Sequence, residues 1–168
     1  METEVRKVEM SENVADPTGL GLLGLAVVCF VVSTSRVGWS GPTTSVIIPW
    51  AVLLGSLAQM IASYFDFKKN NPFESVVFGA YGLFWSAIAG VWLIQMGSFS
   101  PEIQKGFDVT QLAFAFVEFL IFSIFGTITA LKTNKVIFAI MVLICFLFFG
   151  LAADLFLGGC TGFFALAA

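Results

Sequence analysis

The chain has 168 residues, of which 58% are hydrophobic and 11% charged, and phenylalanine alone occurs 20 times. A water-soluble domain of this size could not cover so much apolar side chain with polar surface, so the composition indicates an integral membrane protein. The net charge of −3, with scattered basic residues, excludes nucleic acid as a partner, and the absence of histidine removes the commonest metal ligand and general base.

The amino-terminal segment, residues 1–18, is polar and lacks the cationic-then-apolar order of a signal peptide. We expect it to precede a transmembrane helical domain that takes up residues 19–168. Asp16 is a plausible helix N-cap and Pro17 suits a first helical position, so a first membrane span is expected over residues 20–35. The positive end of this helix dipole would favour an anion.

A second span is expected over residues 45–65, after a glycine-containing loop, with Pro49 tolerated in its first turn. Ser56, Gln59 and Ser63 lie at helical spacing and form one polar stripe on this span. Interhelical hydrogen bonding and the lining of a pore explain such a stripe equally well.

The third span, over residues 73–96, supplies the roughly 20 apolar residues that crossing a bilayer requires. Its aromatic and amide side chains share one face: Tyr81, Trp85, Trp92 and Gln95. Small residues at four-residue intervals run beside them and let a neighbouring helix come close: Gly82, Ser86 and Gly90. Tryptophan and tyrosine are typical interfacial anchors, but Tyr81 and Trp85 lie deep enough that their polar groups need a partner in protein or in a water-lined cavity.

The fourth and fifth spans are expected over residues 109–131 and 136–157. Glu118 falls in the middle of the fourth span, where a carboxyl group is costly. It is either a functional group with a proton or polar role, or a protonated carboxyl that hydrogen-bonds a neighbouring helix. Residues 160–168 are apolar but too few to cross a bilayer, so a sixth span is at best partial.

The basic residues predict the orientation of the chain. Most of them fall on the side of the amino terminus: Arg6, Lys7, Lys68, Lys69, Lys132 and Lys135. Only Arg36 and Lys105 fall on the opposite side. Because cytoplasmic loops carry the excess of lysine and arginine, we expect a multi-pass protein of the plasma (inner) membrane with a cytoplasmic amino terminus.

Several short motifs together resemble one family, the acetate uptake transporters or succinate-acetate permeases. The octet Phe78 to Trp85 matches the family pattern Phe-Gly-x-Tyr-Gly-x-Phe-Trp at every fixed position. The stretch Asp16 to Leu22 is similar to the family signature Asn-Pro-Ala-Pro-Leu-Gly-Leu, although Asp16 replaces asparagine and Gly19 replaces proline. Two shorter matches, Ala58-Gln59 and Phe125-Gly126-Thr127, occur in the expected order.

The resemblance implies an all-α protomer of six transmembrane helices, with the sixth truncated or incomplete here, assembled as a homohexamer. It also implies a narrow acetate path in each protomer, pinched at Tyr81, at Leu25 in the first span, and at Leu143 or Ile144 in the fifth. The residues expected to bind substrate lie at the first helix start and in the second and third spans: Asp16, Pro17, Gly19, Leu20, Gly21, Gln59 and Trp85.

The sequence therefore predicts a permease or channel in the lipid bilayer for acetate and similar small monocarboxylates, with succinate as a larger candidate. A channel for small neutral solutes, such as urea or undissociated acids, and a non-transporting membrane scaffold are the alternatives. Whether an anion would move alone or with a proton stays open. No nucleophile is paired with a base, and neither metal-ligand spacing nor a phosphate-binding loop occurs, so no enzyme, metal or cofactor is expected.

Overall fold

The computed structural model describes residues 15–41 and 45–158. These residues form helices and their connections, without a strand, which confirms the predicted all-helical membrane class. The segments are α1 (Thr18–Arg36), α2 (Ile47–Trp50), the π-helix η1 (Ala51–Ala58), α3 (Gln59–Lys68), α4 (Pro72–Gln95), α5 (Pro101–Lys105), α6 (Val109–Ala130) and α7 (Lys135–Phe156). The expectations for residues 1–14 and for a partial span over 160–168 fall outside the described residues.

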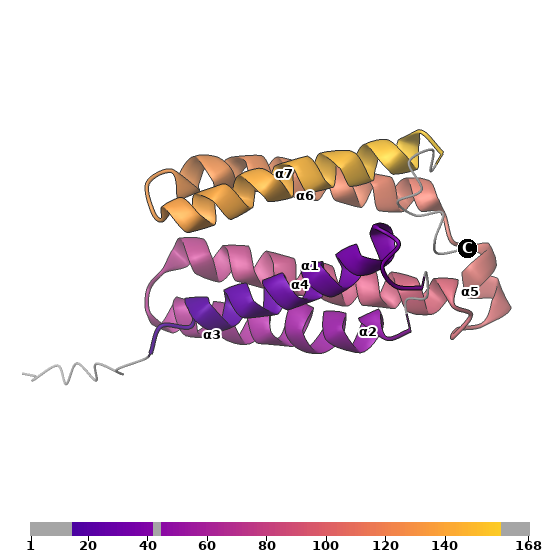
Figure 1. Ribbon diagram of the computed structural model, residues 1–168, viewed down its shortest axis with the longest axis horizontal. Helices are drawn as coiled ribbons and strands as arrows, with labels where there is room; N and C mark the ends of the chain where they lie inside the picture. Colours follow the sequence, from indigo (N-terminus) through magenta and orange to yellow (C-terminus); the bar gives the residue numbers. More distant parts are fainter. Residues whose placement is uncertain (1–14, 42–44, 159–168) are drawn as a thin grey trace, which may run out of the picture.

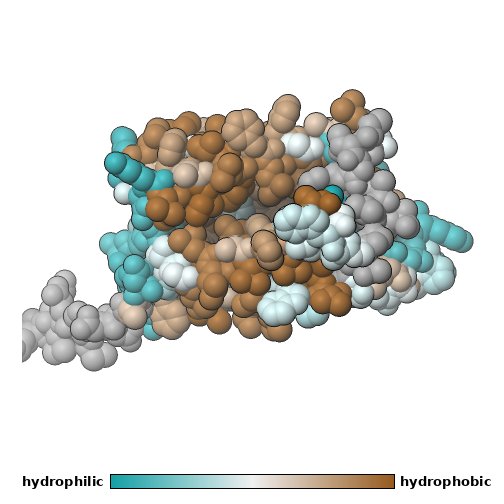
Figure 2. Space-filling view, in the orientation of Figure 1, coloured by the Kyte–Doolittle hydropathy of each residue, from teal (hydrophilic) through white to brown (hydrophobic). Residues whose placement is uncertain are grey.

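Five helical stretches in the described residues are long and apolar enough to cross a membrane: α1, the continuous helix Ile47–Lys68, α4, α6 and α7. They lie roughly side by side (Figure 1). Apolar side chains cover the middle of the molecule, and hydrophilic ones gather at its two ends (Figure 2). A belt of this kind matches the hydrocarbon of a bilayer with a polar interface on either side.

The helices form two layers (Figure 1). The three-helix layer contains α1, the helix Ile47–Lys68 and α4, and the hairpin layer contains α6 and α7. Because successive spans run in opposite directions, the start of α1, the α3–α4 turn and the α6–α7 turn share one end, which we call the Lys69 end. The C-terminal residue of α1 and the short α5 lie at the other, the Arg36 end.

Small residues let the backbones of the three-helix layer come close together. A Cβ atom added at Gly24 of α1 would collide with the carbonyl oxygen of Leu54, and one added at Gly82 of α4 would lie 2.9 Å from the Cγ atom of Met60. Ser56 and Ser86 share a hydrogen bond of 2.6 Å across the same contact. Close backbone approach with hydroxyl hydrogen bonds is how helices associate where lipid supplies no hydrophobic drive.

The polar stripe of the second span serves this packing at two of its three positions. The Ser56 hydroxyl meets Ser86, and the Ser63 hydroxyl donates to the carbonyl oxygen of Ser75 at 2.6 Å. For the two serines, therefore, the structure favours interhelical hydrogen bonding over pore lining. Gln59 lies between them on the same face, but its amide has no hydrogen-bond partner among the described residues.

Large aromatic rings, in contrast, fill the space between the two layers. Phe84 of α4 lies with its ring centroid 4.9 Å from that of Phe119 in α6 and 5.1 Å from that of Phe148 in α7. Phe119 and Phe148 stack at 5.5 Å. The layers are thus joined by interlocking aromatic side chains rather than by backbone contact.

Candidate functional site

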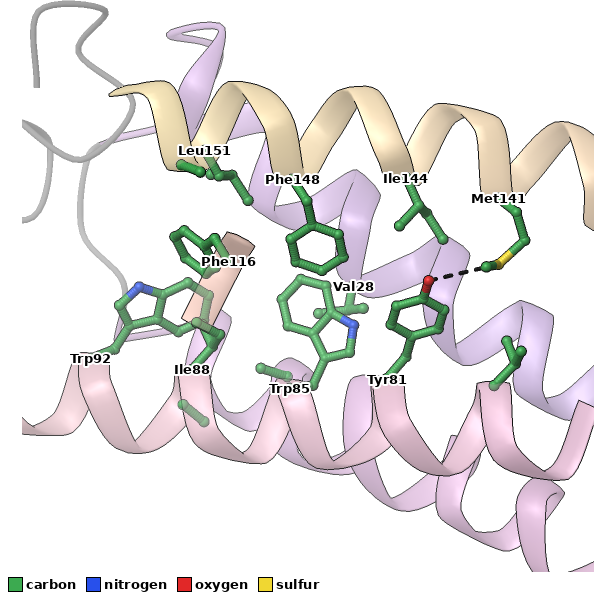
Figure 3. Close-up of a cluster of buried hydrophobic side chains, with 14 of the residues drawn as sticks. Val28, Tyr81, Trp85, Ile88, Trp92, Phe116, Met141, Ile144, Phe148 and Leu151 are labelled. Atoms are coloured by element: carbon green, nitrogen blue, oxygen red, sulfur yellow. Dashed lines mark hydrogen bonds between the residues drawn. The ribbon is translucent and has the colours of Figure 1, made fainter. Parts of the chain in front are cut away.

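Tyr81 of α4 reaches from the three-helix layer into the hairpin layer (Figure 3). Its side chain is only 3% exposed. The Ser123 hydroxyl donates to the carbonyl oxygen of Phe119 at 2.6 Å, so Tyr81 is the donor in its own 2.9 Å contact with Ser123. The Met141 sulfur lies 3.6 Å from the same phenol oxygen as a second acceptor. Tyr81 therefore points at α6 and α7, and not at lipid.

Two cavities lie on either side of Tyr81 along α4. A cavity of about 280 Å³ extends toward the Arg36 end. Its lining is mostly aromatic and aliphatic: Cys29, Val32, Ser33, Arg36, Phe84, Trp85, Ile88, Trp92, Phe116, Leu147 and Leu151. A much smaller one, of about 20 Å³, lies toward the Lys69 end, where Glu74, Leu25, Tyr81 and Met141 are among its lining residues. Tyr81 lines the smaller of the two cavities.

A third hollow, of about 350 Å³, is a groove between α1 and α7. The two layers are visibly parted on the face shown in Figure 2. Leu25, Leu143 and Ile144 all line the groove, but only Leu25 and Ile144 also line the small cavity beside Tyr81. The Leu143 side chain is 68% exposed, whereas Ile144 is 8% exposed. Leu143 and Ile144 were both expected at the constriction, but only Ile144 faces the small cavity beside Tyr81.

The residues at the start of α1 do not come together as a ring of amides around a cavity. Leu20 is 41% exposed, and nothing lies within 4 Å of a Cβ atom built at Gly19. Pro17 is buried, and Gly21 packs so closely on Phe78 that a Cβ atom would lie 2.5 Å from the ring. Gly21 thus packs α1 against Phe78 of α4 at the Lys69 end, whereas Gly19 and Leu20 make no such contact.

Asp16 is exposed, and its carboxylate interacts with the neighbouring residues Thr18 and Lys69. Its carboxylate accepts hydrogen bonds from the Thr18 amide at 3.2 Å and the Thr18 hydroxyl at 2.8 Å, and it pairs with Lys69 at 3.2 Å. The Thr18 hydrogen bonds, and to a lesser degree Lys69, lower the pKa of Asp16. A negative charge at this position is therefore balanced by the protein itself.

Gln59 and Trp85 occupy distinct environments. Gln59 is fully buried, and neither its amide nitrogen nor its amide oxygen has a hydrogen-bond partner among the described residues. A buried amide normally has partners, so Gln59 marks a place where water or a polar solute is needed. Trp85 lines the larger cavity with its indole packed over Gly55, where a Cβ atom would lie 2.8 Å from Cγ of the ring.

Glu118 lies on the outer face of α6 and is exposed, away from the space between the layers.

Arg36 was expected to follow the first span, but it is the last residue of α1. Its side chain lines the larger cavity and interacts electrostatically with Asp154 on α7. Within residues 15–41 and 45–158, no group of three or more His, Cys, Asp or Glu side chains could hold a metal ion.

Sequence reasoning missed Ser123 and Met141, which meet the Tyr81 hydroxyl, and the place of Arg36. Ser123 could have been noticed as a lone hydroxyl inside an apolar stretch of the fourth span. Met141 carries no such signal, because an apolar thioether among apolar residues is ordinary core composition.

Comparison with known proteins identifies relatives along most of the chain. An uncharacterized protein of Methanothermobacter thermautotrophicus is 31% identical over 150 residues, covering 88% of this chain and 73% of its own. The succinate-acetate/proton symporter SatP of Escherichia coli is 27% identical over 126 residues, covering 75% of this chain and 66% of its own. The ammonia transport outward protein 2 of Saccharomyces cerevisiae is 26% identical, and the chain spans 52% of its length.

The fold also matches a solved structure, that of the bacterial acetate channel SatP, with a TM-score of 0.79 and 23% identity over 91% of this chain and 81% of that one. The resemblance drawn from the octet at Phe78 to Trp85 is confirmed by these matches. A model of the GPR1/FUN34/yaaH family matches residues 2–164, and the chain belongs to that family.

Proposed function

We propose that the protein is a membrane permease or channel that passes acetate and similar small monocarboxylates between its two layers, with its narrowest point at Tyr81. The observation that carries this proposal is the position of Tyr81, buried between two cavities with its hydroxyl directed across the interlayer space. Family membership and the transport names of the relatives support it. Succinate, which the name of the Escherichia coli relative includes, is the larger solute to test.

Leu25, Ile144 and Met141 would form the apolar part of the pinch, because they line the small cavity together with Tyr81. A solute passing there loses most of its water, and the Tyr81 and Ser123 hydroxyls would offer replacement hydrogen bonds. Trp85 would line the path on the Arg36 side. Gln59 lines none of the three cavities described above, so we propose its buried, unsatisfied amide only as a contact for water or a polar solute. At the entrance, Asp16, Pro17 and Gly21 would hold α1 in place, while the open Gly19 and exposed Leu20 would face the entering solute.

The protein would lie in the plasma membrane with the Lys69 end in the cytoplasm. Lys68, Lys69, Lys132 and Lys135 lie at that end, whereas Arg36 and Lys105 lie at the other. This asymmetry supports the orientation. We infer an assembly of six copies from the resemblance alone, and the many apolar side chains on the outer surface are compatible with contacts to lipid or to other copies.

A channel for small neutral solutes is the second candidate, because the larger cavity is lined almost wholly by apolar side chains. Away from Arg36 at one end, such a lining offers little compensation to an anion and suits an undissociated acid or urea better.

A competition assay in liposomes separates the candidates. The purified protein would be reconstituted, and uptake of labelled acetate measured at two pH values with excess formate, succinate or urea outside. Vesicles without protein give the background, which must be subtracted because undissociated acetic acid crosses lipid unaided. Competition by formate but not urea supports the carboxylate path. Competition by urea supports the neutral-solute channel. If neither labelled acetate nor, in a second assay, labelled urea shows protein-dependent uptake, the result supports the scaffold.

A further inference from the structure

Asp66, near the end of α3 at the Lys69 end, is a buried carboxyl group that the proposed path does not yet use. Its side chain is fully buried. Asn71 donates to its Oδ1 atom at 3.3 Å, and its Oδ2 atom has no hydrogen-bond partner among the described residues. An ionised carboxylate taken out of water needs several hydrogen bonds or a close cation, and a neutral acid needs far fewer.

The charged groups around Asp66 supply poor compensation for a second negative charge. Glu74 on α4, Asp16 before α1 and Lys69 after α3 all act on it electrostatically. Lys69 already pairs with Asp16 at 3.2 Å, and the ammonium group of Lys68 lies 5.3 Å from the centre of the Tyr64 ring. Asp66 therefore lies under the influence of another carboxyl group and of one cation, Lys69, which Asp16 already engages, so a negative charge on Asp66 is weakly compensated.

Glu74 connects this buried group to the space beside Tyr81. Its Oε2 atom lies 2.6 Å from the Thr18 hydroxyl, whose one proton it shares with Asp16. The Glu74 side chain also lines the cavity of about 20 Å³ that Tyr81 and Met141 border. One water molecule needs roughly 10–15 Å³ of such space. Glu74 thus borders the proposed path and also acts electrostatically on Asp66.

We propose that Asp66, with Glu74 beside it, binds and releases the proton that accompanies a carboxylate through this protein. In each cycle one proton joins a carboxylate oxygen of the pair and later leaves it, and one solute carboxylate crosses, so that no net charge moves. The inference rests on the proposed function and decides between anion movement alone and proton-coupled movement. Glu118 does not fill this role, because it is exposed on the outer face of α6.

The substitution Asp66→Asn tests the proposal, because an amide resembles the neutral acid but cannot release a proton. The reconstituted full-length protein is assayed in two modes: exchange of labelled for unlabelled acetate at equal pH, and initial uptake driven by an inward proton gradient of about one pH unit. With one proton per carboxylate, such a gradient corresponds to about tenfold accumulation of acetate at equilibrium, and it should stimulate the initial uptake by the wild type. In Asp66→Asn we expect the gradient to have no effect on the initial uptake rate. The rate of acetate exchange at equal pH should stay within about twofold of wild type.

Glu118→Gln and Glu102→Gln are the matched controls, since both remove an exposed carboxyl group away from the pair. Both should keep the gradient stimulation. Stimulation that persists in Asp66→Asn overturns the proposal, and so does the loss of both modes in a folded, correctly sized Asp66→Asn protein, because Asp66 would then be structural. If Asp66→Asn does not fold, Glu74→Gln is measured instead, and unchanged stimulation there overturns the proposal. Absence of exchange in the wild type would refute the proposed function itself.

Discussion

The interior of the three-helix layer and the space between the two layers are packed in opposite ways. Within the three-helix layer, glycines and serines bring backbones together, as at Gly24 against Leu54 and at Gly82 against Met60. Between the layers, large rings such as Phe84 and Phe148 meet side chain to side chain and leave cavities of about 280 and 20 Å³. The first kind of packing gives a rigid support, and the second leaves room for a small solute. The rigid three-helix layer therefore lies directly beside the interlayer space through which we propose that the solute passes.

The largest effect should come from crowding the rigid layer. In Gly24→Ala, the added methyl group collides with the Leu54 carbonyl, so we expect a loss of about 1–3 kcal/mol of stability, as for other overpacked contacts. The measurement is thermal unfolding of the detergent-solubilised protein. Gly90→Ala is the control, because nothing lies within 4 Å of its added Cβ atom. It should leave stability unchanged or raise it, by up to about 1 kcal/mol, since alanine favours a helix over glycine.

A smaller effect is expected from the interlayer hydrogen bond. Ser123→Ala removes the acceptor that lies 2.9 Å from the Tyr81 hydroxyl and leaves the Met141 sulfur as the remaining partner. We expect a loss of about 1 kcal/mol. Unfolding measurements on Ser123→Ala, Tyr81→Phe and the double variant would give the coupling between the two hydroxyls. Fully additive losses would show that the contact contributes nothing.

The smallest effect concerns the entrance at the Lys69 end. The Thr18 hydrogen bonds and Lys69 lower the pKa of Asp16, so its contribution to stability is present above the ordinary aspartate pKa and is lost as the pH falls through the lower, folded-state value. Because Asp16 is exposed, the contribution should be no more than a few tenths of a kcal/mol. Asp16→Asn should therefore flatten the acid side of the stability profile slightly. An unchanged profile would mean that the contact with Thr18 does not persist in solution.

The sequence was enough to predict the class of fold and the family, because span length, apolar composition and the octet at Phe78 to Trp85 are local features. It was not enough to decide which side of a helix meets which neighbour. Successive helical residues point about 100° apart, so Leu143 lies on the groove while Ile144, one residue later, turns inward, and Met141, three residues earlier, shares the inward face. Glu118 illustrates the same limit, since its depth could be read from the sequence but its outward direction could not.

The central claim is that small carboxylates pass beside Tyr81, and a pair of tyrosine variants tests it most directly. Tyr81→Trp enlarges a side chain that is 3% exposed between the layers, and Tyr64→Trp makes the same change at a residue 55% exposed on the outside of α3. We expect protein-dependent acetate uptake in liposomes to fall by about tenfold or more in Tyr81→Trp, which corresponds to about 1.4 kcal/mol, and to stay at the wild-type rate in Tyr64→Trp. Equal uptake by wild type and a folded Tyr81→Trp protein would contradict the account.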